Sequence, residues 1–132
     1  MKKDRHYNVG SLYFSKMKIQ IISDLHQEFG SADLFFDQSD VVVLAGDINL
    51  GTKGIDWIKL KIKNKPVIYV LGNHEYYKGS YPKTLNKIKA EAEDSNIFVL
   101  ENDAVDIDGK SVFMEPRFGR TFLFSEILYI ME

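Results

Sequence analysis

Three apolar runs, each closed by a short polar motif, constrain the fold of this 132-residue chain more than any other feature. Residues 19–23, 41–45 and 67–71 are rich in β-branched and aliphatic side chains, and the second run reads Val-Val-Val-Leu-Ala. A continuous apolar run is typical of a parallel strand buried on both faces. Isoleucines at helical spacing lie between the second and third runs, in residues 55–62. This alternation predicts an α/β fold, with a layered parallel or mixed sheet and flanking helices.

The polar motifs that follow the three runs carry side chains that bind metals or move protons. They are Asp24-Leu25-His26, Gly46-Asp47 and Gly72-Asn73-His74-Glu75. Because the carboxyl ends of parallel strands meet at one edge of a sheet, we expect these side chains to converge there. Carboxylate, imidazole and amide oxygen ligands together suit hard or borderline divalent metals. The pattern therefore predicts a metal site at this edge.

Taken together, the motifs D-x-H, G-D and G-N-H-[DE] resemble the signature of the calcineurin-like metallophosphoesterases. The resemblance implies that Asp24 and His26 bind one divalent ion, that Asp47 bridges two ions, and that Asn73 binds the second ion. The ions would be of the Mn, Fe or Zn class. The fold implied is about half of the family's two-sheet sandwich.

The same resemblance gives roles to the last two residues of the third motif. His74 would face the leaving group of a phosphoester and serve as the catalytic residue, donating a proton or stabilising charge. Glu75 would orient His74 or a metal ligand from outside the metal's own shell. Each motif alone also has a plain structural interpretation, since Asp and Asn commonly cap helices or form turns.

The chain departs from the family pattern after His74. It has three histidines in all, at positions 6, 26 and 74, whereas the family completes its site with further histidines downstream. We therefore place a partial metallophosphoesterase domain at 17–113, with weak or partial metal binding. Residues 1–16 are interpreted as an N-terminal extension, disordered or upstream of the fold. Residues 114–132 lack a clean period and are interpreted as an out-of-frame tail; a short protein with a novel C-terminus is the competing interpretation.

The predicted function is metal-dependent hydrolysis of phosphomonoesters or phosphodiesters at a dinuclear site, impaired by the missing histidines. The alternative is a non-catalytic metal-binding or protein-interaction scaffold with the same fold. A net charge of −2 gives no basic field for nucleic acid, and we predict no specific binding to it. No run approaches the roughly 20 apolar residues of a membrane span. We expect a cytoplasmic location, a phosphoester substrate and self-association through an exposed sheet.

Overall fold

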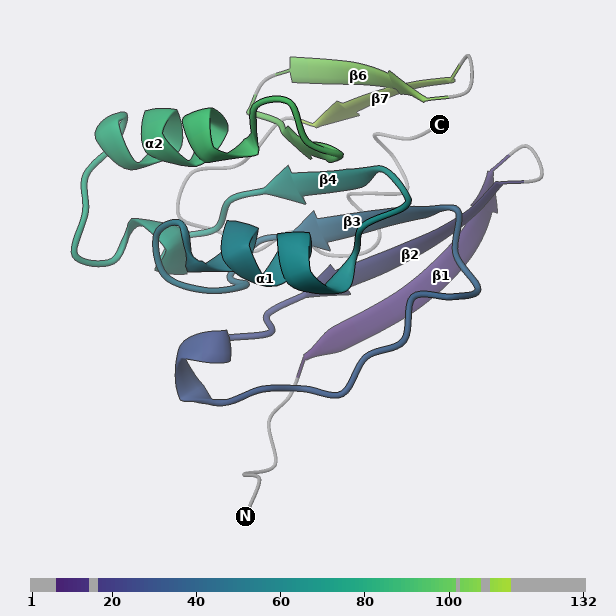
Figure 1. Ribbon diagram of the computed structural model, residues 1–132, viewed down its shortest axis with the longest axis horizontal. Coiled ribbons are helices and arrows are strands. Elements are labelled where there is room, and N and C mark those ends of the chain that lie inside the picture. Colours follow the sequence, from purple (N-terminus) through teal and green to yellow (C-terminus); the bar gives the residue numbers. More distant parts are fainter. Residues whose placement is uncertain (1–6, 15–16, 102, 108–109, 115–132) are drawn as a thin grey trace.

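A five-stranded sheet with two helices forms the body of the protein (Figure 1). The computed structural model describes residues 7–14, 17–101, 103–107 and 110–114. The strand order in the sheet follows the chain, from β1 to β5. Its strands are β1 (Asn8–Phe14), β2 (Met17–Ser23), β3 (Val41–Ala45), β4 (Val67–Val70) and β5 (Ile97–Val99). Strands β2 to β5 are parallel, and β1 pairs antiparallel with β2, so the sheet is mixed.

Two α-helices, two short 3₁₀ helices and a hairpin complete the described fold. The helices are α1 (Lys53–Lys61), α2 (Lys83–Ala92), η1 (Gln27–Phe29) and η2 (His74–Tyr76). The hairpin strands β6 (Asp103–Ile107) and β7 (Lys110–Met114) pair with each other, antiparallel, in a separate sheet. Helices α1 and α2 connect parallel strands, as such crossovers require. Neither α-helix in the described part of the chain is long and apolar enough to span a membrane.

The core lies on both faces of the sheet because alternate residues of each strand point to opposite sides. Toward the helices, Val42 and Leu44 of β3 belong to a fully buried cluster that includes residues of α1 and α2. Toward the other face, Val41 and Val43 belong to a second cluster, against which Val105 of β6 packs. The predicted burial of this strand on both faces is therefore confirmed. A strand buried in this way is rigid, so the loop that follows it starts from a fixed point.

The N-terminal segment differs from the sequence expectation. Residues 1–16 showed no strand pattern, yet residues 8–14 form β1 along the full length of β2. The reason is that β1 is an edge strand: Val9 and Tyr13 are 43% and 73% exposed, so little apolar patterning is required of it. The predicted out-of-frame tail at 114–132 lies outside the described residues, apart from Met114.

Candidate metal centre

The loops after β2 and β3 are joined to each other beyond the end of the sheet. The backbone N–H of Asp24 donates to the carbonyl oxygen of Gly46 at 3.1 Å, and that of His26 donates to the carbonyl of Asp47 at 2.9 Å. These bonds continue the strand pairing past the last residues of β2 and β3. Side chains on the two loops are therefore held at a fixed spacing, which a metal site requires.

The glycines of two motifs allow the loops after β3 and β4 to approach closely. Gly46 has φ +91°, and a Cβ built on it would lie 3.2 Å from the backbone nitrogen of Gly72. A Cβ on Gly72 would lie 2.8 Å from the backbone nitrogen of Asp47 and would also contact that residue's Oδ1. Only hydrogen fits in these places. The motif glycines thus place Asp47 against the loop that carries Asn73 and His74.

Asp47 is the centre of the arrangement. It is 3% exposed, and its Oδ1 accepts a hydrogen bond from the backbone N–H of His74 at 2.9 Å. The side-chain amide of Asn73 faces the Asp47 carboxylate. With its nitrogen inward, the amide donates to the two carboxylate oxygens at 3.1 and 3.2 Å. A bound cation would instead favour the opposite orientation of the amide, with its oxygen inward.

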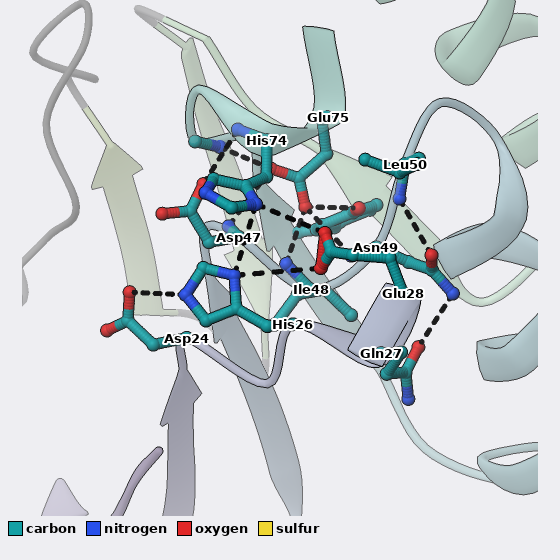
Figure 2. A network of polar contacts seen from close by, with 12 residues as sticks. Asp24, His26, Gln27, Glu28, Asp47, Ile48, Asn49, Leu50, His74 and Glu75 are labelled. Atoms are coloured by element: carbon teal, nitrogen blue, oxygen red, sulfur yellow. Dashed lines mark hydrogen bonds and ion pairs between the residues drawn. The ribbon is translucent and has the colours of Figure 1, made fainter. Parts of the chain in front are cut away.

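Two imidazole rings complete the cluster (Figure 2). The Nδ1 atoms of His26 and His74 lie 3.2 Å apart, and the ring centroids are 4.3 Å apart. One potential ligand atom from each of His26, Asp47 and His74 lies within 4.8 Å of the others. Asp24 is on the far side of His26, with its Oδ1 3.7 Å from Nε2. All five residues predicted for the site thus lie in one group, and His74 is among the potential ligands.

Three of the predicted ligands have a backbone conformation that non-glycine residues rarely adopt. Asp24, His26 and Asp47 have φ values of 61°, 47° and 55°. Among the described residues only Lys78 and Asp94 share this left-handed conformation without being glycine. Such residues cost of order 1–3 kcal/mol each and cluster at functional sites. The fold therefore holds these three side chains in place at a cost in stability, which points to a role in function.

Glu75 lies beneath the cluster and is completely buried. Its Oε1 accepts the backbone N–H groups of Asp47 at 3.0 Å and Gly72 at 2.7 Å. Its Oε2 accepts the N–H of Ile48 at 2.7 Å and the hydroxyl of Tyr69 at 2.9 Å. One carboxylate therefore binds the loops after β3 and β4 together, at the point where they present the metal ligands.

The sequence led us to expect that Glu75 orients His74 or a metal ligand from outside the metal's own shell. Its described hydrogen bonds go to backbone groups and to Tyr69, so it acts on the loops that carry the ligands. Burial raises the pKa of Glu75 above its ordinary value, and the bonds from Ile48, Gly72 and Tyr69 oppose that rise. Burial, together with the nearby Glu75, also raises the pKa of Tyr69 well above its ordinary value.

Glu28 is the site residue that the sequence did not indicate. Its Oε2 lies 3.1 Å from Nδ1 of His74, and its Oε1 lies 3.6 Å from Nδ1 of His26 (Figure 2). The only available signal was its spacing, since Asp24, His26 and Glu28 occupy alternate positions along one loop. That spacing predicts convergence only for an extended segment, whereas this segment turns sharply at His26 and enters η1.

A family model for the calcineurin-like phosphoesterases matches residues 17–127 of the 132. The chain belongs to this family. A search among curated proteins finds no match. The match begins at the first residue of β2 and extends past residue 113, where we had placed the end of the resemblance. At the level of the family, the chain is therefore a metal-dependent phosphoesterase of the hydrolase class. Its five-stranded sheet and two helices are consistent with part of the family fold.

The chemistry of the donor set fits a divalent ion. Asp24 and Asp47 supply carboxylate oxygens, His26 and His74 supply imidazole nitrogens, and Asn73 supplies an amide oxygen. Oxygen and imidazole donors of this kind bind Mn, Fe and Zn ions.

Proposed function

We propose that this chain hydrolyses phosphomonoesters or phosphodiesters at a divalent-metal centre formed by the ends of β2, β3 and β4. The observation that carries the proposal is the convergence of His26, Asp47 and His74 within 4.8 Å at the edge of the sheet. The family match supports the same activity. Asp24 and His26 would hold one ion, and Asp47 and Asn73 would hold or share a second.

The bound ions would polarise the phosphoryl group and lower the pKa of a water molecule, which supplies the nucleophile. The chain's own residues have two tasks. Asp47 is held rigid by the His74 backbone N–H, so the spacing of the site does not relax when the substrate arrives. Nδ1 of the His74 ring faces His26 and Glu28, which leaves Nε2 for the leaving-group oxygen. A ring protonated at both nitrogens would donate its Nε2 proton to that oxygen.

The ligand count favours weak binding of a single ion over a tight pair. The chain has three histidines, and two of them are already in the described cluster. A dinuclear centre needs enough donors to close two coordination shells, and with His74 assigned to the leaving group the described set offers four side chains. We propose that activity is correspondingly impaired. The limited number of imidazoles also favours the second candidate function, a metal-binding scaffold that does not turn over substrate.

Hydrolysis of a nitrophenyl phosphomonoester and a bis-nitrophenyl phosphodiester with Mn²⁺ tests the proposal. We expect a Mn²⁺-dependent rate that disappears in Asp47→Asn, because the neutral amide lacks the negative charge with which Asp47 would hold the cation. His74→Ala is expected to slow turnover by roughly 10²- to 10⁴-fold, the usual effect of losing an acid–base group. Mn²⁺ binding without any hydrolysis of either ester would instead favour the scaffold. Hydrolysis that survives in Asp47→Asn would place the active site elsewhere.

A further inference from the structure

Glu28 is a partly buried acidic residue to which the proposed reaction assigns no task. It lies in η1, directly after the sharp turn at His26, and its side chain is 10% exposed. The loop that carries it is fixed on both sides. The N–H of Gln27 donates to the carbonyl of Ile48 at 2.8 Å, and the N–H of Phe29 donates to the carbonyl of His26 at 2.9 Å. The carboxylate therefore has a defined position.

Both oxygens of this carboxylate are directed to the histidine rings, as Figure 2 shows. Oε2 is within hydrogen-bond distance of Nδ1 of His74, at 3.1 Å. Oε1 is at ion-pair distance from Nδ1 of His26, at 3.6 Å, and has no hydrogen-bond partner within the described parts of the chain. A buried carboxylate oxygen without a hydrogen-bond donor is costly. The Glu28 carboxylate contacts two imidazole rings rather than backbone N–H groups, so a role in holding the backbone does not explain its position.

We propose that Glu28 is a positioning residue shared by the two histidines of the metal centre. It accepts Nδ1–H of His74, so that Nε2 of that ring faces the substrate. It also orients Nδ1 of His26, so that Nε2 of His26 stays on the side of Asp24, 3.7 Å from its Oδ1. The inference rests on the proposed function and extends it, because it names the residue that sets the direction of both rings.

The arrangement has a clear physical basis. A histidine that binds a metal through one nitrogen commonly donates its other N–H to a carboxylate, which fixes both the tautomer and the ring orientation. Here one carboxylate reaches both rings. Because the Nδ1 atoms are 3.2 Å apart, two N–H groups at these positions would repel each other, and the negative charge of Glu28 offsets that repulsion. Loss of such a partner typically weakens metal affinity or activity 10- to 100-fold.

Nuclear magnetic resonance of the histidine ring nitrogens tests the inference in the metal-free protein. Long-range proton–nitrogen spectra distinguish the two neutral tautomers, and the chain has only three histidines to assign. The spectra are recorded at about pH 8.5, about two pH units above the ordinary histidine pKa of about 6.5. We expect His74 to carry its proton on Nδ1 in the wild type and in Glu28→Gln, where an amide oxygen remains. In Glu28→Ala the proton should move to Nε2.

Calorimetric titration with Mn²⁺ gives the second measurement on the same variants. Glu28→Ala should bind Mn²⁺ about 10- to 100-fold more weakly than the wild type, and Glu28→Gln should lose less. The matched control is Glu91→Ala, which makes the same change at an exposed position of α2 and should bind as the wild type does.

Two results would overturn the inference. One is a Glu28→Ala protein whose tautomers and Mn²⁺ affinity equal those of the Glu91→Ala control. The other is a Glu28→Gln protein that loses Mn²⁺ binding as completely as Glu28→Ala, which would make Glu28 a direct metal ligand. A wild type that binds no Mn²⁺ would contradict the proposed function instead, while the tautomer pattern of the metal-free protein would still report on Glu28.

Discussion

Two glutamates of the same small region, Glu28 after β2 and Glu75 after β4, have different kinds of hydrogen-bond partner. Glu75 is completely buried, and backbone N–H groups and a tyrosine hydroxyl donate to both of its oxygens. Glu28 is 10% exposed and turns both oxygens to imidazole rings, one of them without a hydrogen bond among the described residues. Glu75 therefore binds mainly the backbone of the loops, whereas Glu28 contacts the two histidine rings of the candidate metal centre.

This difference shows how burial alone fails to separate structural acids from functional ones. A carboxylate whose acceptor positions are all filled by backbone donors fixes the chain, and its removal should cost stability. A carboxylate that faces potential metal ligands fixes side-chain directions, and its removal should cost metal affinity. Stability and metal binding can be measured separately, so substitutions at the two glutamates test whether their roles differ.

The largest expected effect on stability is that of Glu75→Gln. The substitution replaces one carboxylate oxygen with an N–H₂ group that faces two buried donors, so both lose their acceptor. We expect the free energy of unfolding to fall by about 3 kcal/mol, since each unsatisfied buried donor costs about 1–3 kcal/mol. Urea denaturation of the metal-free protein measures this loss. Glu28→Gln should lose less than about 1 kcal/mol in the same experiment, and equal losses in the two variants would erase the distinction.

Gly72→Ala should have the next largest effect, because the added Cβ would displace Asp47. Overpacking at a site without space typically costs 1–3 kcal/mol, and we expect about 2 kcal/mol here. Mn²⁺ affinity should fall with it, since the carboxylate that moves is a predicted ligand. Gly51→Ala is the matched control: its φ of +51° strains any side chain, but nothing lies within 4 Å of the new Cβ. That variant should lose about 1 kcal/mol and keep its Mn²⁺ affinity. If Gly72→Ala bound Mn²⁺ as tightly as the wild type, Asp47 would not be a metal ligand.

The smallest predicted effect is that of Tyr69→Phe, which removes one of the donors to Glu75. A single hydrogen bond contributes about 1 kcal/mol, so thermal or urea unfolding should show a loss of that order. The control is Tyr77→Phe, because Tyr77 is 51% exposed and its hydroxyl makes no bond in this network. If both variants unfold alike, the Tyr69 hydroxyl contributes nothing to the support of Glu75.

The sequence predicted those parts of the fold in which burial determines which side chains are apolar. The strands at 41–45 and 67–70 are buried on both faces and are therefore apolar throughout. Strand β1 was missed because an exposed edge strand can hold Asn, Gly and Ser without penalty. The meeting of Asp24, Asp47 and His74 followed from one rule, that parallel strands end at the same edge.

Glu28 could not be predicted in this way, because its position depends on the backbone turn at His26. A left-handed φ of 47° at a histidine leaves no pattern in the sequence, and it is this turn that places the carboxylate between two rings. The hydrogen-bond partners of Glu75 were not predicted either, for a related reason. Its partners are mostly backbone N–H groups, which every residue type except proline carries, so the sequence contains no sign of them.

We infer that the ends of β2, β3 and β4 form a divalent-metal centre around Asp47. Calorimetric titration of the metal-free chain with Mn²⁺ tests it most directly, alongside Asp47→Asn and the exposed control Asp56→Asn on α1. We predict weak binding of one ion per chain in the wild type and in Asp56→Asn, and its loss in Asp47→Asn. The claim would be contradicted if the wild type bound no ion, or if Asp47→Asn bound Mn²⁺ as the wild type does.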